Sequence, residues 1–120
     1  MYIVNLEQFR ALPPYTVFRK YEPCIAGDLS FKFDTWEHDF ISMTVEFPES
    51  NSSDELFARL DEMERTGCSY QLDVDCAGRD GLFEKDQLFL IYDAADLTAL
   101  RGLIDIAIAS AAPTPTSKEE

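Results

Sequence analysis

The sequence predicts a small single domain of the α+β class, with an antiparallel or mixed sheet of four to five strands and helices packed on it. Two segments alternate apolar and polar residues, as half-buried strands do, and the apolar run Leu88 to Tyr92 suits a central strand. Two further segments place apolar residues at helical spacing behind N-cap signals. The chain has 120 residues, 46% of them hydrophobic, with nine Phe and five Tyr, which is enough to build one core.

The first half of the chain predicts one short helix and three strands. Asn5 and Gln8 have the spacing of a capping box, so a short N-terminal helix is expected over 6–11, ended by two prolines. Residues 15–21 form a strand by composition. Two alternating strands follow and form a hairpin. Their inward side chains are expected to be Leu29, Phe31 and Phe33 in the first and Ile41, Met43, Val45 and Phe47 in the second, with Ser30, Lys32 and Asp34 in water.

The second half predicts the two main helices and two more strands. Ser52 and Glu55 have capping-box spacing, so a helix is expected from there to Gly67, with apolar Leu56, Leu60 and Met63 on one side. The segment 68–75 alternates and predicts a strand with Cys68, Tyr70, Leu72 and Val74 facing inward. After the apolar strand 88–92, Asp93 caps the last helix, whose inward residues are expected to be Leu97, Leu100, Ile104 and Ile108.

We expect one domain over residues 1–110 and a flexible tail over 111–120, which has two prolines and no periodicity. The amino terminus has no basic leader and no long apolar run, and Asp96, Arg101 and Asp105 interrupt the most apolar stretch of the chain. Three cysteines cannot close a full internal set of disulfides. These features indicate a protein of the reducing cytoplasm that does not enter membranes.

The charge of the chain is strongly negative and unevenly distributed. With 23 acidic and 10 basic residues the net charge is −13, and the 33 residues at the amino terminus contribute none of the excess. The densest window, residues 34–64, has ten acidic residues and a single basic one, Arg59. Such a body is repelled by nucleic acids and anionic lipid and attracted to basic protein surfaces. An equally simple interpretation is a solubilising surface without a partner.

The sequence therefore favours a small acidic inhibitor that neutralises a basic, nucleic-acid-binding protein, such as a nuclease, by presenting carboxylates in place of phosphates. Phage counter-defence proteins of the anti-CRISPR type and toxin-immunity proteins act in this way. We expect no direct binding of nucleic acid, no cofactor and no metal, and the sequence leaves a homodimer open. The predicted partner-binding residues all lie in the acidic window: Asp34, Trp36, Glu37, Asp39, Asp54, Asp61, Glu62 and Glu64.

The alternative function is a calcium-binding domain or a small metal-dependent hydrolase. Asp73, Asp75, Gly78 and Glu84 match positions one, three, six and twelve of an EF-hand calcium loop, and Asp80 adds a carboxylate. The match is incomplete, because Ala77 occupies position five and the preceding segment predicts a strand where an EF-hand has a helix. A loop whose acids are simply solvated explains the same residues.

No set of catalytic residues stands out, and we expect a protein that is not an enzyme. The single histidine, His38, lies between two acidic residues in the predicted hairpin turn, where a solvent-exposed role explains it. Cys68 and Cys76 have the inward parity of the strand predicted over 68–75, which indicates packed, inert thiols, whereas Cys24 lies in a loop. Phosphate-binding glycine loops and paired zinc ligands are absent from the sequence.

Overall fold

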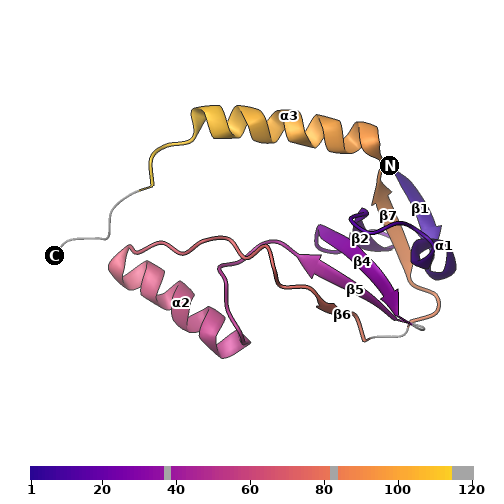
Figure 1. Ribbon diagram of the computed structural model, residues 1–120, viewed down its shortest axis with the longest axis horizontal. Helices are drawn as coiled ribbons and strands as arrows, with labels where there is room; N and C mark the ends of the chain where they lie inside the picture. The colour runs from indigo at the N-terminus through magenta and orange to yellow at the C-terminus, as the bar shows by residue number, and fades with distance from the viewer. Residues whose placement is uncertain (37–38, 82–83, 115–120) are drawn as a thin grey trace.

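Figure 1 shows a computed structural model of the chain, which describes residues 1–36, 39–81 and 84–114, with Trp36 described by its backbone alone. The α+β class and the single antiparallel sheet are confirmed. The sheet has seven strands rather than four or five, in the order β1-β7-β2-β4-β5-β6, and β3 pairs with the end of β2. The strands are β1 (Tyr2–Asn5), β2 (Val17–Glu22), β3 (Ile25–Ala26), β4 (Ser30–Trp36), β5 (Asp39–Thr44), β6 (Gly78–Arg79) and β7 (Leu88–Tyr92).

The sequence missed three strands because they form by backbone pairing and not by side-chain pattern. β3 and β6 have two residues each, and β1 pairs with β7 along Tyr2–Asn5 although two of its three apolar side chains are exposed. The strand predicted over 68–75 is wrong. This segment reaches beyond the sheet and forms only an isolated bridge between Leu72 and Pro48, so Tyr70, Leu72 and Val74 are exposed by 37%, 54% and 67%.

The core is a cluster of phenylalanines beneath the helix α1 (Leu6–Arg10). The predicted capping box forms, since the Gln8 amide donates to Asn5 and the Asn5 amide donates to the Gln8 side chain. This start of the helix points Phe9 into the sheet. Phe9 is fully buried, stacked on Phe89 at 3.9 Å between ring centroids, with Phe18 and Phe40 edge-on at 4.7 and 4.9 Å.

Two polar residues of β4, Ser30 and Lys32, lie on the covered face of the sheet and not in water as predicted, whereas Asp34 is exposed as expected. Ser30 and Lys32 are exposed by only 7% and 2%, while Phe31 and Phe33 are half-buried on the other face. The face with Ser30 and Lys32 is the one that α1 and the segment after it cover. The Lys32 ammonium donates to the carbonyls of Leu12 and Phe33 at 2.9 and 3.1 Å and lies 5.8 Å from the Phe9 ring. Burial lowers the pKa of Lys32.

The two main helices form where the sequence predicts them but pack less than expected. They are α2 (Ser53–Thr66) and α3 (Ala94–Ser110), and neither contains a buried residue. α3 contacts the sheet only near its start and then extends away from it, and α2 lies at the far end of the long axis of the molecule (Figure 1). The expectation that Ile104 and Ile108 face the core is wrong, since they are exposed by 50% and 69%. The result is an elongated molecule of 55 × 34 × 27 Å.

Among the helices of the described ranges, none combines the length and the apolar character that crossing a membrane requires. Of the expected tail, residues 111–114 are exposed, and 115–120 lie outside the described part of the chain.

Candidate protein-binding surface

The helix α2 carries four of the eight predicted partner-binding residues and has strong signals at both ends. Ser52 is its N-cap, and its hydroxyl accepts from the Glu55 amide at 3.1 Å. Asp54 and Glu55 place negative charge at the positive end of the helix dipole. Gly67 ends the helix with a left-handed φ of 74°, a conformation that residues other than glycine rarely adopt. These local signals explain why the helix forms although it buries little apolar surface.

The outer side of α2 combines carboxylates with an exposed aromatic ring. Residues at spacings of three, four and seven share one side of a helix, which places Asp54, Asp61 and Glu64 around Phe57. All four are exposed, and Phe57 is exposed by 67%. We call this set of Asp54, Phe57, Asp61 and Glu64 the acidic helix face. The opposite side of α2, with Leu56, Leu60 and Met63, is half-buried.

Some of the carboxylates of α2 form ion pairs or hydrogen bonds with neighbouring side chains. Arg59 pairs with Glu55 at 2.7 Å and Arg65 with Asp61 at 3.4 Å, both one helical turn apart. Glu62 points back toward the segment after the helix, where it accepts from the Tyr70 hydroxyl at 2.6 Å. This bond raises the pKa of Tyr70. Glu62 is therefore half-buried in a contact within the molecule and does not belong to the acidic helix face.

The remaining predicted residues lie elsewhere, so the acidic window does not form one surface. Asp34 is exposed near the end of β4, and β4 lies with the rest of the sheet at the opposite end of the molecule from α2 (Figure 1). Trp36 contributes its backbone to β4, while its side chain, Glu37 and His38 lie outside the described residues. The window separates because the chain runs back along β5 before it enters α2.

Asp39 does not face a partner at all, because it is exposed by only 2%. Its carboxylate accepts from the amides of Phe40 at 2.8 Å and Gly81 at 3.0 Å, and it pairs with Arg79 at 3.0 Å. Gly81 has a φ of 72°, a conformation suited to glycine. Burial opposes ionisation of Asp39, but the two amides and the guanidinium outweigh it and lower the pKa. Asp39 therefore ties β5 to the segment that follows β6.

The carboxylates of the alternative metal site do not gather around one point. No group of three or more His, Cys, Asp or Glu side chains with metal-binding geometry occurs in the described part of the chain. Asp73 accepts from the Asp75 amide at 2.9 Å in a local turn. Asp80 instead pairs with Lys20 of β2. Asp73 and Asp80, both half-buried, thus serve separate local contacts.

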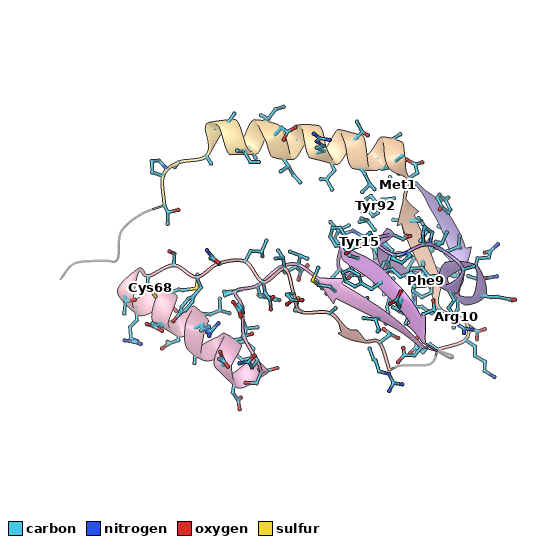
Figure 2. All side chains as sticks on the ribbon, in the orientation of Figure 1. Met1, Phe9, Arg10, Tyr15, Cys68 and Tyr92 are labelled. Atoms are coloured by element: carbon cyan, nitrogen blue, oxygen red, sulfur yellow. The ribbon has the colours of Figure 1, made fainter. Side chains whose placement is uncertain are left out.

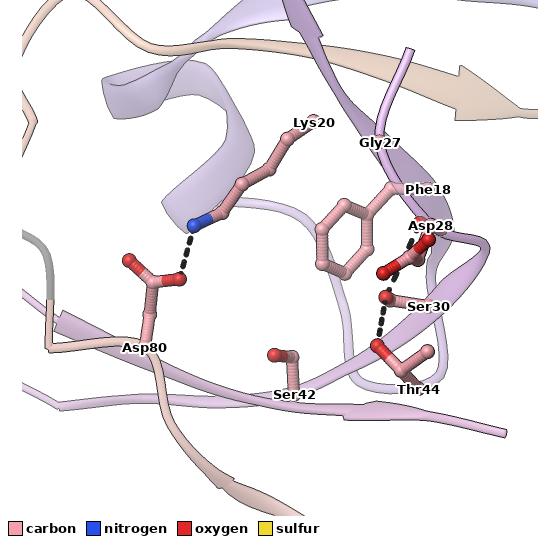
Figure 3. A pocket seen from close by; sticks show the side chains of 8 residues that line it. All are labelled: Phe18, Lys20, Gly27, Asp28, Ser30, Ser42, Thr44 and Asp80. Carbon is pink, nitrogen blue, oxygen red and sulfur yellow. Dashed lines mark hydrogen bonds and ion pairs between the residues drawn. The ribbon is translucent and has the colours of Figure 1, made fainter. Parts of the chain in front are cut away.

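The Lys20–Asp80 pair borders a cavity of about 270 Å³ on the polar part of the sheet (Figure 3). Across it, Ser30 and Thr44 share a hydrogen bond of 2.7 Å, and the Phe18 ring lies between the two pairs (Figure 3). The charged groups Lys20 and Asp80 neutralise each other, and the hydroxyls of Ser30 and Thr44 satisfy each other. We interpret this cavity as a feature of the folded sheet, since these four polar groups already have partners.

The three cysteines are free thiols at separate places. Cys24 is exposed, as expected for a loop residue. Cys76 is also exposed, and the prediction that it packs inward is wrong because its segment is not a strand. Its thiol nevertheless donates a hydrogen bond to the Thr44 carbonyl at 3.4 Å. Cys68 is half-buried.

Comparison with protein-family models, curated proteins and solved structures found no match. The case for function therefore depends on the geometry of the chain itself. The residue that sequence reasoning missed is Phe57. Its signal was present, because a large aromatic residue lies on the side of the helix that otherwise has carboxylates.

Proposed function

We propose that the protein is a non-catalytic acidic binding protein that docks a basic, nucleic-acid-binding protein on the acidic helix face. The observation that carries the proposal is the exposed Phe57 ring among three exposed carboxylates on a well-capped helix. Aromatic residues surrounded by polar groups are the usual anchors of protein interfaces. The net charge of −13 favours approach of a cationic partner.

Charge alone does not explain tight binding by α2. The helix carries five carboxylates and two guanidinium groups, a net charge of −3 over its 14 residues. At about 1.5 Å per residue its length is about 21 Å. One DNA strand carries about six phosphates over that length. With about half the charge of a single strand, α2 needs the apolar contact of Phe57 as well, and burial of this ring contributes about 1–2 kcal/mol.

The basic partner would be neutralised because its nucleic-acid site is occupied. Guanidinium and ammonium groups that bind phosphate oxygens also bind carboxylates, with similar charge-assisted hydrogen bonds. Inhibition of a nuclease or another nucleic-acid-binding complex, in toxin immunity or phage counter-defence, is the role that fits this chemistry. We further propose that the protein acts in the cytoplasm, where three free thiols persist.

The test is capture of partners from a lysate with the tagged full chain, followed by mass spectrometry at low and high salt. We expect basic nucleic-acid-binding proteins to be retained at low salt and weakened at high salt. In the variant D61K/E64K this capture is expected to be lost. The variant F57A is expected to weaken it at both salt concentrations, because the apolar contact is not screened.

The matched control is E22K/D86K, which changes the net charge by the same amount at exposed positions away from α2. It should retain the partner. Equal loss of capture in both charge variants would show that the overall negative charge of the protein retains basic proteins without a specific site, and the proposed docking face would be wrong. Failure to capture any basic protein would also overturn the proposal.

A further inference from the structure

The helix α3 exposes an apolar surface that no other described segment of the chain covers. It follows β7 directly and extends away from the sheet, as Figure 2 shows with its side chains. Every residue from 101 to 110 is exposed. Among them are four large aliphatic side chains, Leu103, Ile104, Ile106 and Ile108, exposed by 66%, 50%, 67% and 69%.

A helix of this composition is not stable alone in water. Isolated helices of this length are marginal even when rich in alanine, and most helix stability in proteins comes from packing of an apolar face. Three β-branched isoleucines and Gly102 lower the propensity further. Within the described part of the chain, α3 has one ion pair between its side chains, Arg101 with Asp105 at 4.0 Å. Both groups are largely exposed, so this pair contributes little to the stability of the helix. The capping box at Asp93 and Asp96 stabilises only the first turn.

The large apolar residues of α3 concentrate on one side. Leu97, Leu100, Ile104 and Ile108 follow one another at spacings of three and four, with Leu103 and Ala107 beside them. Ile106 lies on the opposite side, among Ala95, Ala99 and Gly102. We call the first set, from Leu97 to Ile108, the apolar stripe of α3. It has the form of a helix–helix packing surface.

We propose that this stripe packs against the same stripe of a second copy of the chain, with the two α3 helices antiparallel about a two-fold axis near Leu103. Charge selects this occupant. Arg101 and Asp105 lie two residues on either side of Leu103. The two-fold axis therefore brings Arg101 of each copy opposite Asp105 of the other, and the surface is complementary to itself. The proposal does not depend on the function proposed for α2.

Other occupants fit the helix less well. Binding flat on a membrane requires lysine and arginine on the polar face, and α3 has only Arg101. A basic partner is attracted to carboxylates, whereas Arg101 and Asp105 beside the stripe balance each other. With a net charge of −13 on each copy, the pairing is helped by salt, which screens repulsion beyond a Debye length of about 8 Å.

The area of the stripe sets the strength of the pairing. Leu103, Ile104 and Ile108 are exposed and each bury on the order of 100 Å², and the half-buried Leu97 and Leu100 and the small Ala107 each bury on the order of 50 Å², which gives about 450 Å² per copy. Stable interfaces bury about 800 Å² per partner. We therefore expect a dimer that dissociates on dilution.

The test is sedimentation equilibrium of the full chain over a range of concentrations, with two isoleucine variants. I104Q changes the stripe, and each dimer contains two copies of the change, so its dissociation constant should rise by about a hundredfold or more. I106Q makes the same chemical change on the opposite side and should leave the dimer intact. Both residues are exposed in the single chain, so neither variant should unfold the sheet.

Charge reversal tests the antiparallel arrangement. R101D and D105R each place like charges opposite one another and should weaken the dimer, and R101D/D105R should restore it. A wild type that stays monomeric at high concentration, or equal effects of I104Q and I106Q, would overturn the pairing. A dimer whose dissociation constant does not change in R101D and D105R would overturn the antiparallel register. Binding of the monomer to neutral phosphatidylcholine vesicles, weakened by I104Q, would assign the stripe to a membrane and overturn the proposal.

Discussion

Replacement of Asp39 by asparagine tests the interpretation that this acid is a structural bond and not part of a binding surface. The carboxylate accepts from the amides of Phe40 and Gly81 and pairs with Arg79. The asparagine side chain keeps one acceptor oxygen and turns an NH₂ group toward a donor, so at least one charge-assisted bond is lost. Such bonds contribute about 1.5–3 kcal/mol. The Arg79 side chain is 51% exposed, so water lies close. We expect D39N to lower the free energy of unfolding by about 1.5–2 kcal/mol at neutral pH, the lower part of that range.

The pH dependence of this loss supplies the sharper test. The folded pKa of Asp39 lies below the ordinary value of 3.8. Its contribution to stability is therefore complete above the unfolded pKa and disappears as the pH falls through the folded value. Urea unfolding of wild type and D39N should show the full difference near neutrality and a shrinking difference below pH 3.8. Acidification also neutralises the other carboxylates and so reduces repulsion among them, but this effect is nearly the same in both proteins and cancels in the difference.

The matched control is D61N, at an exposed position in a pair of 3.4 Å with Arg65. An exposed pair one turn apart contributes about 0.3–0.5 kcal/mol. If D39N costs no more than D61N at neutral pH, or if its effect does not change on acidification, the assignment of Asp39 as a structural bond is refuted.

Two further predictions concern the core and the thiols. F9A should lower the free energy of unfolding in urea by about 3–5 kcal/mol, because Phe9 is fully buried against three rings, whereas F57A should change it little. Equal losses for the two variants would contradict the described core. Partial desolvation of the Cys76 thiol, which contacts the Thr44 carbonyl although the residue is exposed, raises its pKa, and Asp73 and Asp75 nearby raise it further. At mildly alkaline pH a thiol reagent should therefore modify Cys24 before Cys76, as followed by mass spectrometry, and the reverse order would contradict this account.

Local signals along the chain determined most of the secondary structure. The caps at Asn5, Ser52 and Asp93 depend on bonds between residues three apart, and all three helices begin where these signals occur. Alternation located the β4–β5 hairpin, and the apolar run located β7 between two neighbours. These features are legible in the sequence because the interacting residues are close along the chain. Net charge is likewise a property of composition.

Only the tertiary structure decided which residues share a surface. The acidic window is continuous in sequence, yet β4 and α2 lie at opposite ends of the molecule, and Asp39 is buried and pairs with Arg79, forty residues away. The sides of β4 could not be assigned either, because alternation identifies two faces but does not say which one α1 covers. Apolar spacing in α3 likewise predicts a packing face without naming its partner. Contacts between distant segments set burial and surface, and they depend on how the chain is folded back on itself.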